Sequence, residues 1–424
     1  MESTLDSIFK SAVEARELPG VAAIALDATG SVLYSNGFGR ISIDDPESSK
    51  ITTTTPLTIF SCTKLFTAVA ALKLLEEGRL SLQDPVAKYC PEIAEIPILK
   101  GLNEDGSPET EKAKNETTIL HLFTHTAGFS YDFFEMDTLR VRLHREDMPG
   151  ASMTAVKEYY NAPRIHEAGE KYTYGLNTDW LGFVVEAITG MSLPEYIDET
   201  IVQPLGLKNT RVSLTAEESK ELFLLHMKDP SGKLSLGPLI RDPTAPLEVN
   251  GGGDCLFSTA EDLAQFFLVF LNKGTHPVSG VTILKPETVD KYLFTDLLPS
   301  VGCSNDRVGA IPSSIPPITS TGSFLPGVEK GWSAGLLINN EALPNGRSKG
   351  SGAWAGLGNL YYWIDPTAGK LGLVASSYFP FFDKSALHLT DALERAVYGK
   401  PMASEMGEKG SNFECDLPNV ASKM

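Results

Sequence analysis

The segment Phe60-Ser-Cys-Thr-Lys64 places a serine three residues before a lysine, ahead of a long apolar stretch. Residues three apart share one face of a helix, with Cβ atoms about 5–6 Å apart, so the Lys64 amine can reach the Ser61 hydroxyl. A serine hydroxyl becomes a useful nucleophile when a neighbouring group takes its proton. The segment therefore predicts a serine nucleophile at the start of a helix, where free backbone N–H groups favour developing negative charge.

The spacing alone does not single out this pair of residues. Ser7-Ile-Phe-Lys10 has the same spacing, but it lies in an amphipathic N-terminal stretch with no apolar strand before it. That context is typical of a solvated helix face. For Ser61 itself, the alternative interpretation is an N-cap serine followed by an exposed lysine. Other segments of the sequence are needed to distinguish a nucleophile from an N-cap serine at this position.

Composition limits the possible classes of function. The chain has 424 residues and 42% apolar residues, as expected of a soluble globular protein with room for two lobes. Its formal charge of −18, without a basic patch, argues against nucleic acid and anionic membranes as partners. The N-terminus has no signal-peptide pattern, and no apolar run is long enough to span a membrane. Five scattered cysteines indicate reduced thiols rather than disulfides or zinc, so we expect a cytoplasmic protein.

The order of apolar patterns along the chain predicts an α+β fold. Two strands come early, and several more come late. They most simply form one antiparallel sheet, which the first and last helices cover while the helical middle is inserted as a second lobe. The expected strands are 20–26, 32–38, 331–338, 351–357, 359–364 and 370–377, and the expected helices include 64–77, 117–126, 178–189, 194–203, 259–273 and 383–397.

This arrangement divides the chain into three parts. Residues 1–60 together with 326–398 form the sheet-and-helix lobe, 61–325 form the mostly helical lobe, and 399–424 form a polar tail that we expect to be disordered. Long loops, such as 101–108 and 299–327, separate the helices of the middle part. A cleft between two lobes is the usual place for a ligand.

Three further segments carry residues suited to chemistry. In 168–190, a turn leads to Tyr174 and then to an amphipathic helix that ends in glycine. In 250–263, a glycine-rich loop enters a helix through a Ser/Thr cap. In 354–357, the sequence Trp-Ala-Gly-Leu lies on a late strand.

In this order, the four segments resemble the serine β-lactamase and penicillin-binding-protein superfamily. The resemblance covers residues 5–398 and is strongest for the class C-like esterases and transesterases. Around Tyr174 the chain is similar to the lovastatin-type acyltransferases of fungi. His121–Gly128 and Pro204–Thr210 also look like landmarks of the superfamily. The resemblance implies a β-lactamase/transpeptidase-like fold.

The resemblance also implies roles for individual residues. Ser61 would be the nucleophile, and Lys64 and Tyr174 would form the base system. Lysine and tyrosine ordinarily have pKa values near 10, so burial and cationic neighbours would have to retune them. Which of the two accepts the proton stays open, because a coupled pair titrates as a unit. The backbone N–H groups of Ser61 and Leu357 would form the oxyanion hole, with Gly356 permitting close approach.

Two departures from the superfamily's pattern bear on the substrate. Its third motif is usually Lys-Thr-Gly or His-Thr-Gly, whereas this chain has Trp354-Ala-Gly356. Its second motif is usually Tyr-x-Asn, whereas this chain has Tyr174-Gly-Leu176. The cation that anchors a β-lactam carboxylate and the asparagine that holds a peptide-like amide are therefore missing. Both differences point away from β-lactams and peptidoglycan and toward apolar acyl esters.

Other matches to catalytic motifs have simpler explanations. Tyr34-Ser-Asn36 lies in the early hairpin, where a strand tyrosine normally packs, and Tyr159-Tyr-Asn161 lacks the following glycine-terminated helix. Gly331-Trp-Ser-Ala-Gly335 matches a nucleophile elbow, with Asp365 or Asp383 and His388 after it. That elbow needs a helix directly after the serine, and here a strand follows. We therefore expect Ser333 to be a strand residue beside the cleft.

Histidine and aromatic residues near these motifs also need an interpretation. His121 and His125 are four apart, but no third ligand has suitable spacing, so a helix-capping, packed pair is expected rather than a metal site. We expect Glu170 and Asp179 to be solvated. The candidates for a substrate pocket are Tyr131, Trp332, Trp354 and Gly356, with Phe129, Phe133 and Phe134 as further aromatic neighbours.

Together these observations predict a serine-dependent acyl enzyme. It would attack an ester or thioester through Ser61 and pass the acyl group to an alcohol or to water, without a cofactor. The donor could be a small molecule or an acyl group on coenzyme A or a carrier protein. We expect an acyltransferase of secondary metabolism, with a carboxylesterase as the alternative. A β-lactamase or D-Ala peptidase, or a binding protein without catalysis, are further alternatives.

Overall fold

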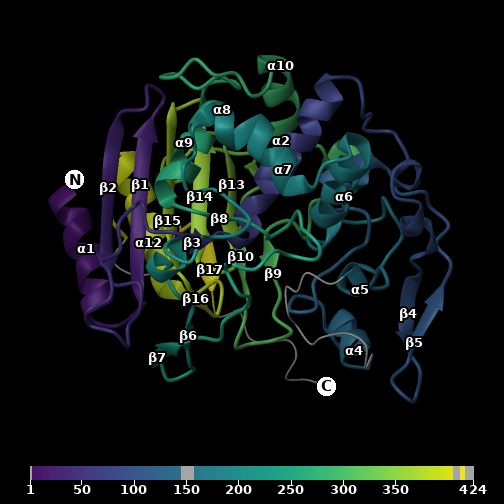
Figure 1. The fold of residues 1–424 in the computed structure, drawn as a ribbon, viewed down its shortest axis with the longest axis horizontal. Helices are drawn as coiled ribbons and strands as arrows, with labels where there is room; N and C mark the ends of the chain where they lie inside the picture. Colours follow the sequence, from purple (N-terminus) through teal and green to yellow (C-terminus); the bar gives the residue numbers. More distant parts are fainter. Residues whose placement is uncertain (1, 145–156, 404–410, 416–424) are drawn as a thin grey trace.

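The computed structural model describes residues 2–144, 157–403 and 411–415. Its largest element is a seven-stranded sheet that combines two strands from the early part of the chain with five from the late part (Figure 1). All neighbouring strands are antiparallel, and β1 pairs with β15, with Ala22 opposite Ala375. The order across the sheet is β11 (Lys330–Trp332), β12 (Leu337–Asn339), β13 (Gly352–Gly356), β14 (Leu360–Asp365), β15 (Lys370–Ala375), β1 (Gly20–Asp27) and β2 (Val32–Gly39).

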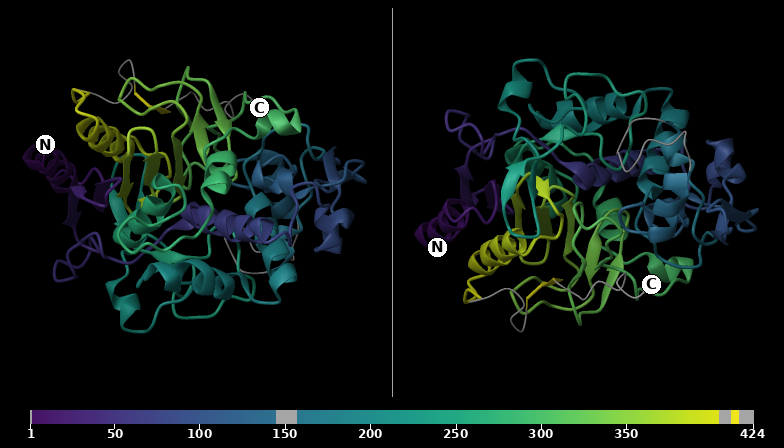
Figure 2. Two further views of the ribbon diagram at one scale, coloured as in Figure 1. Left: turned by 90° about the horizontal axis from the view of Figure 1, so that it is seen from above. Right: turned by 90° about the horizontal axis from the view of Figure 1, so that it is seen from below.

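Helices cover both faces of this sheet, which explains its nearly continuous apolar strands. Seven of the eight residues of β1 are buried, as expected for a strand with no face in water. α1 (Glu2–Glu14) and α12 (Lys384–Val397) pack together on one face, and α9 (Ala260–Leu271) packs against β1 and β15 (Figure 2). The predicted α+β fold, with terminal helices over an antiparallel sheet, is confirmed.

The helical part is built around α2 (Thr63–Glu76), which runs through the middle of the molecule (Figure 1). Nearly all of its residues are buried, because the helix is apolar on every side. It packs against α6 (Asn177–Thr189), and α6 packs against α3 (Ile119–Phe123) and α7 (Leu193–Ile197). α6 ends at Gly190, whose φ of +72° is a left-handed cap that glycine adopts without strain.

Shorter elements fill the remainder of the described chain. Among the helices are α4 (Met136–His144), α5 (Lys157–Tyr160), α8 (Gln203–Leu205), α10 (Pro286–Thr288) and α11 (Leu298–Val301), and single turns lie at Val86–Lys88, Pro91–Glu95, Asp198–Val202, Glu218–Glu221 and Val289–Leu293. The short strands are β3 (Leu57–Thr58), β4 (Ile98–Leu102), β5 (Pro108–Glu111), β6 (His226–Lys228), β7 (Leu234–Leu236), β8 (Phe257–Ser258), β9 (Ala310–Ile311), β10 (Gly322–Phe324), β16 (Tyr378–Phe379) and β17 (Phe413–Cys415).

The structure differs from the sequence-based expectation at three places. The predicted strand 331–338 is a hairpin, because the chain reverses at a tight turn in which Ser333 N donates to Leu336 O at 2.9 Å. The loop predicted at 101–108 lies within the β4–β5 hairpin, which turns at 103–107. Part of the tail expected to be disordered, 413–415, pairs with β10 as β17.

Most of the remaining tail, at 404–410 and 416–424, lies outside the described residues. None of the helices in the described part of the chain combines the length and apolar content that a bilayer crossing requires. The division into a sheet lobe and a helical lobe stays a prediction.

Candidate active site

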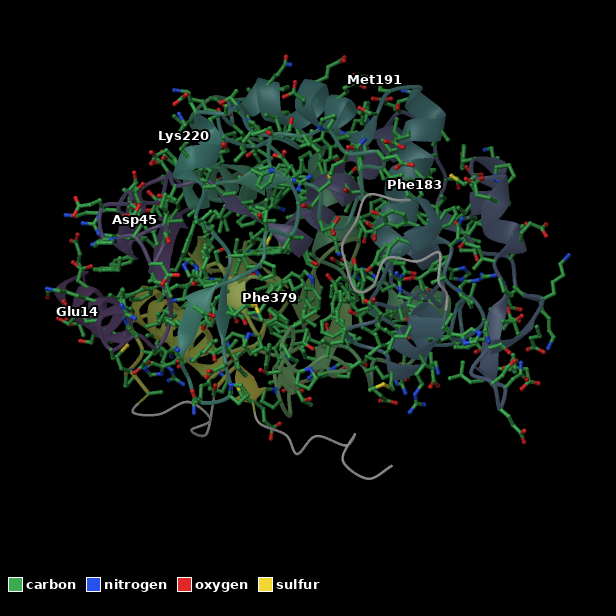
Figure 3. The ribbon with its side chains drawn as sticks, turned by 60° about the horizontal axis from the view of Figure 1, so that its bottom comes forward. Glu14, Asp45, Phe183, Met191, Lys220 and Phe379 are labelled. Carbon is green, nitrogen blue, oxygen red and sulfur yellow. The ribbon has the colours of Figure 1, made fainter. Side chains whose placement is uncertain are left out.

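Ser61 lies in a single 3₁₀ turn, Phe60–Cys62, that leads directly into α2. Phe60 has a φ of +45°, an uncommon backbone conformation for a residue with a bulky side chain. Such strain persists only where the surrounding structure enforces it, and it is concentrated at functional sites. The Phe60 ring packs 5.9 Å from the ring of Phe379, which lies near the centre of the view in Figure 3. The serine is thus held on a strained turn inside the molecule.

Lys64 is buried, and its amine has three oxygen partners. Nζ donates to Ser61 Oγ at 3.1 Å, to the Tyr131 hydroxyl at 2.9 Å and to Gly253 O at 3.0 Å. A lysine ammonium has three N–H donors, so these contacts use all of them. The predicted i, i+3 contact between serine and lysine is present, and the amine is fixed in place on two further sides.

Tyr174 lies beside this pair, with its hydroxyl turned to Trp354. The Tyr174 oxygen accepts a hydrogen bond from Trp354 Nε1 at 2.9 Å. Lys64 Nζ is 5.0 Å from the centre of the Tyr174 ring and contacts its face. At the position of the superfamily's usual cation, this chain therefore presents a neutral N–H donor to the phenol oxygen.

The turn that carries Tyr174 is fixed by a close backbone contact and by a buried amide. A Cβ on Gly175 would lie 2.4 Å from Phe129 O, so only glycine fits there. The Asn177 amide donates to Phe129 O and to His125 Nδ1. The His125 ring lies 4.7 Å from the Tyr174 ring. Burial, and secondly the Lys64 charge, hold the pKa of His125 well below its usual value, so this histidine is a neutral packing partner.

His121 has the predicted capping role. Its Nδ1 accepts a hydrogen bond from Thr118 N at 3.1 Å, in a capping box at the start of α3. The described residues contain no group of three or more potential metal ligands.

Asp179, which the sequence led us to expect in solvent, is buried. It lies in the first turn of α6, on the side that faces α2, and its Oδ1 accepts a hydrogen bond from Gly253 N at 2.8 Å. A Cβ on Gly253 would lie within 3 Å of Lys64 Nζ and of both Asp179 carboxylate oxygens. The carboxylate and the ammonium thus flank the same glycine. Burial raises the pKa of Asp179, and the Lys64 charge opposes that shift. Glu170 is exposed, as expected.

The glycine-rich loop contributes a second acid, Asp254, which sequence reasoning did not select. It lies one residue after Gly253 and lines the same pocket as Ser61. Burial, followed by the negative charge of Asp179, raises its pKa to about 7. The only sequence signal was its place in a glycine run. Tyr131 was predicted as a pocket residue, but its contact with Lys64 was not predicted.

The pocket in front of Ser61 is narrow, with a volume of about 20 Å³, and is mostly aromatic. Here it is called the Ser61 pocket, and its walls include Tyr131, Phe133, Phe134, Tyr174, Trp354 and Leu357. Two residues predicted to contact substrate or its neighbours lie elsewhere. Trp332 is fully buried behind Trp354, because its Nε1 donates to Phe123 O. Phe129 stacks on Trp180 in the core.

Strand β13 passes close to the nucleophile turn, as Gly356 suggested. A Cβ on Gly356 would lie 2.5 Å from Ile59 O, so no larger residue fits. Ser61 and Leu357 both line the pocket. Among the described residues, neither of their backbone N–H groups donates to a protein acceptor. Both residues that the resemblance assigns to the oxyanion hole thus lie at the same pocket.

The alternative motifs lie in structural settings. The Tyr34 hydroxyl donates to Asp6 in a buried contact between β2 and α1. Tyr159 is buried beneath Arg142, whose guanidinium lies 3.7 Å from the ring centre. Ser333, expected beside the cleft, is fully buried in the β11–β12 turn, where its Oγ donates to Leu336 O.

Proteins similar to this chain along most of its length include acyltransferases and an esterase from fungi. Monacolin J acid methylbutanoyltransferase of Aspergillus terreus is 27% identical over 405 residues, which cover 93% of this chain and 95% of that protein. Lovastatin esterase of Penicillium rubens is 27% identical over 366 residues, covering 85% of this chain and 89% of the esterase. A solved mutant of simvastatin synthase from Aspergillus terreus superposes with a TM-score of 0.79 at 27% identity, over 94% of this chain and 96% of that chain. The beta-lactamase family matches residues 5–395, almost the whole sequence, and the chain therefore belongs to the beta-lactamase family.

Proposed function

We propose that this protein transfers an acyl group from a small ester or thioester to an alcohol through an acyl-serine on Ser61. The observation that carries the proposal is the 3.1 Å contact between Ser61 Oγ and the buried Lys64 amine on a strained turn that opens into an apolar pocket. A serine oxygen held by a buried amine at the edge of an apolar pocket is an arrangement expected of covalent acyl catalysis.

Tyr174 takes the serine proton in this proposal. Lys64 Nζ already donates to three oxygens, one of them Ser61 Oγ, so the proton passes to another group. The Tyr174 oxygen accepts a hydrogen bond from the Trp354 N–H, and Lys64 Nζ lies at the face of its ring, so both interactions place positive potential near the phenol oxygen. The Ser61 O–H bond breaks as the Oγ–C bond forms, and the proton passes to the Tyr174 oxygen.

The tetrahedral intermediate needs donors for its oxyanion. The carbonyl electron pair moves onto oxygen between the free N–H groups of Ser61 and Leu357. When the intermediate collapses, the leaving alcohol or thiol takes the proton from Tyr174. The acceptor alcohol then repeats these steps in reverse. A thioester carried by coenzyme A or a carrier protein enters the same chemistry as a small ester.

The test is product analysis after acylation. The protein is given p-nitrophenyl butyrate with and without an apolar primary alcohol, and the butyrate products are quantified. We expect the butyrate ester of the alcohol to exceed free butyric acid once the alcohol reaches millimolar concentration. Butyric acid alone, at every alcohol concentration and for every alcohol in a panel, would rule out the transfer activity.

A carboxylesterase is the second candidate function. Ser61 is partly exposed in its pocket, which leaves a path for water. The similarity to a lovastatin esterase is as high as that to a methylbutanoyltransferase. Both reactions share the acyl-serine and differ in whether water or a bound alcohol attacks it. The same product ratio distinguishes them.

A further inference from the structure

A second, larger cavity lies next to the Ser61 pocket. Its volume is about 140 Å³, against about 20 Å³ for the Ser61 pocket, so it is the roomier of the two adjoining spaces. Its walls include the segments 222–225 and 236–241, together with Leu247, Val249 and Phe257. They are mainly leucine, isoleucine, valine and phenylalanine side chains. This space is called the second cavity below.

The two spaces share two wall residues, Phe60 and Asp254. Phe60 is the strained residue that precedes the nucleophile, and Asp254 belongs to the glycine-rich loop that holds Lys64. The second cavity and the Ser61 pocket therefore adjoin at Phe60 and Asp254. Ser61 itself does not line this cavity.

Polar groups converge at one end of this otherwise apolar cavity. A Cβ on Gly251 would lie 2.6 Å from the Tyr160 hydroxyl and 2.7 Å from Asp254 Oδ1, so these two oxygens approach the same point. Arg241 donates through Nη2 to Val212 O and Cys255 O, while its buried Nη1 has no hydrogen-bond partner. Arg241 thus contributes a positive charge to this end of the cavity, while Tyr160 and Asp254 contribute the oxygens.

The charges around Asp254 favour a neutral ligand. Lys64 on α2 and Asp179 on α6 already oppose each other across Gly253, and Arg241 faces Asp254 from the second cavity. Since burial keeps the pKa of Asp254 near 7, its carboxyl exchanges hydrogen bonds with a hydroxyl in either protonation state. An added carboxylate would instead place a further negative charge beside two acids.

We propose that the second cavity is the acceptor subsite and binds a neutral alcohol with an apolar ring or chain body, its hydroxyl directed to Asp254 at the wall shared with the Ser61 pocket. The inference rests on the proposed acyl transfer. An acyl chain bonded to Ser61 Oγ must extend into the space that Ser61 lines, and so it occupies the Ser61 pocket. The remaining cavity is left for the molecule that attacks the acyl group.

The binding test uses 2-(1-naphthyl)ethanol as the alcohol and isothermal titration calorimetry as the measurement. Ser61→Ala protein excludes turnover, so binding is measured without transfer. In this background, Val249→Trp fills the second cavity and is expected to weaken binding at least about tenfold, or about 1.4 kcal/mol. The matched control is Glu248→Trp, which adds the same bulk at an exposed neighbouring position and is expected to change affinity less than about twofold.

A second comparison tests the orientation of the alcohol. Asp254→Asn and Asp254→Leu are measured with 2-(1-naphthyl)ethanol and with 1-ethylnaphthalene, which lacks the hydroxyl. The preference of Ser61→Ala protein for the alcohol should fall about three- to tenfold with leucine, the value of one hydrogen bond, and less with asparagine. An unchanged preference in the leucine variant would contradict the orientation. This comparison needs no bulky substitution, so it remains decisive if Val249→Trp fails to fold.

Two outcomes overturn the inference itself. The first is equal loss of affinity in the Val249→Trp and Glu248→Trp proteins. The second is loss of alcohol binding when Ser61 carries a butyl phosphonate, because the two ligands would then share one pocket. Failure of the proposed function looks different. If the alcohol binds, Val249→Trp abolishes binding, and native protein still yields only butyric acid, the cavity assignment stands and transfer is excluded for this alcohol class.

Discussion

Ser61 and Ser333 each match a nucleophile motif, and the two serines differ in exposure, backbone conformation and hydrogen-bond partners. Ser61 is partly exposed, follows a residue with φ of +45°, and contacts a buried amine at 3.1 Å. Ser333 is fully buried, and its Oγ both accepts from Leu336 N and donates to Leu336 O inside a tight turn. A satisfied hydroxyl stabilises its turn, whereas a hydroxyl beside a base and an open pocket is available for reaction. The surroundings, and not the motif, separate the two.

The largest expected effect is on catalytic activity, and it tests the difference between Ser61 and Ser333. Ser61→Ala should lower kcat/KM for p-nitrophenyl butyrate by at least about 10³-fold, because it removes the oxygen that forms the acyl intermediate. Ser333→Ala should leave kcat/KM within about threefold and instead reduce the free energy of unfolding by about 1–2 kcal/mol, because it removes two buried hydrogen bonds. Steady-state kinetics and urea unfolding of both variants check the pair. The reverse pattern would move the nucleophile to Ser333.

A second prediction concerns the amine next to Ser61. Lys64→Ala should lower kcat/KM by about 10²–10⁴-fold, the usual contribution of a group that assists proton transfer. It should also destabilise the fold, because Asp179 loses the cation that opposes its burial. Lys10, the lysine of the other Ser-x-x-Lys pair, is exposed, so Lys10→Ala is the matched control and should change neither quantity. A Lys64→Ala protein within tenfold of native activity would remove the amine from the mechanism.

A smaller effect is expected at the indole that contacts Tyr174. Trp354→Phe removes the N–H donated to the phenol oxygen and keeps an aromatic ring in the pocket wall. Loss of one hydrogen bond to a charged oxygen should lower kcat about 10- to 100-fold, with a smaller change in KM. Trp363→Phe on the neighbouring strand is the control, because the Trp363 Nε1 is buried without a partner. Equal effects of the two variants on kcat would mean that the Trp354 N–H has no role in the reaction.

The smallest effect is on stability and depends on pH. The pKa of Asp254 is about 7 in the folded protein against an ordinary 3.8, so the folded state holds this proton more tightly than the unfolded chain does. Its contribution to stability is therefore present below about pH 4 and is lost as pH rises to about 7. Asp254→Asn should be about 1–2 kcal/mol more stabilising at pH 8 than at pH 5, a value reduced from the full shift because Asp254 lines a pocket.

Urea unfolding of native and Asp254→Asn protein at the two pH values measures this difference. Glu248→Gln, on an exposed carboxylate of the adjacent loop, is the control and should show no such dependence. The same stability difference at pH 5 and pH 8 would contradict the assigned shift.

The sequence was sufficient for those parts of the site that depend on local spacing. The contact between Ser61 and Lys64 follows from helical geometry, and the sheet follows from apolar strands at both ends of the chain. The single strand predicted at 331–338 was wrong, because the short stretch of small residues at 333–335 is a tight turn that the apolar residues on either side do not reveal. The local sequence pattern therefore predicts helices and strands well, but it does not show where the chain turns back on itself.

The contacts that the sequence did not reveal join residues far apart in the chain. Lys64 reaches Tyr131 and Gly253, which are 67 and 189 residues away. Asp179 was expected in solvent because an acid in the first turn of a helix normally faces water, and only the packing of α6 against α2 buries it. The aromatic side chains that line the pocket also depend on tertiary packing. Trp354 lines the pocket, whereas Trp332 does not.

The most direct test of the account is to locate the acyl group on the chain. Native protein is quenched in acid during turnover of p-nitrophenyl butyrate, digested, and analysed by peptide mass spectrometry. The account predicts one butyryl group on the peptide that contains Ser61, and none after Ser61→Ala. A butyryl group on the Ser333 peptide, or turnover without any acylated serine, would contradict it.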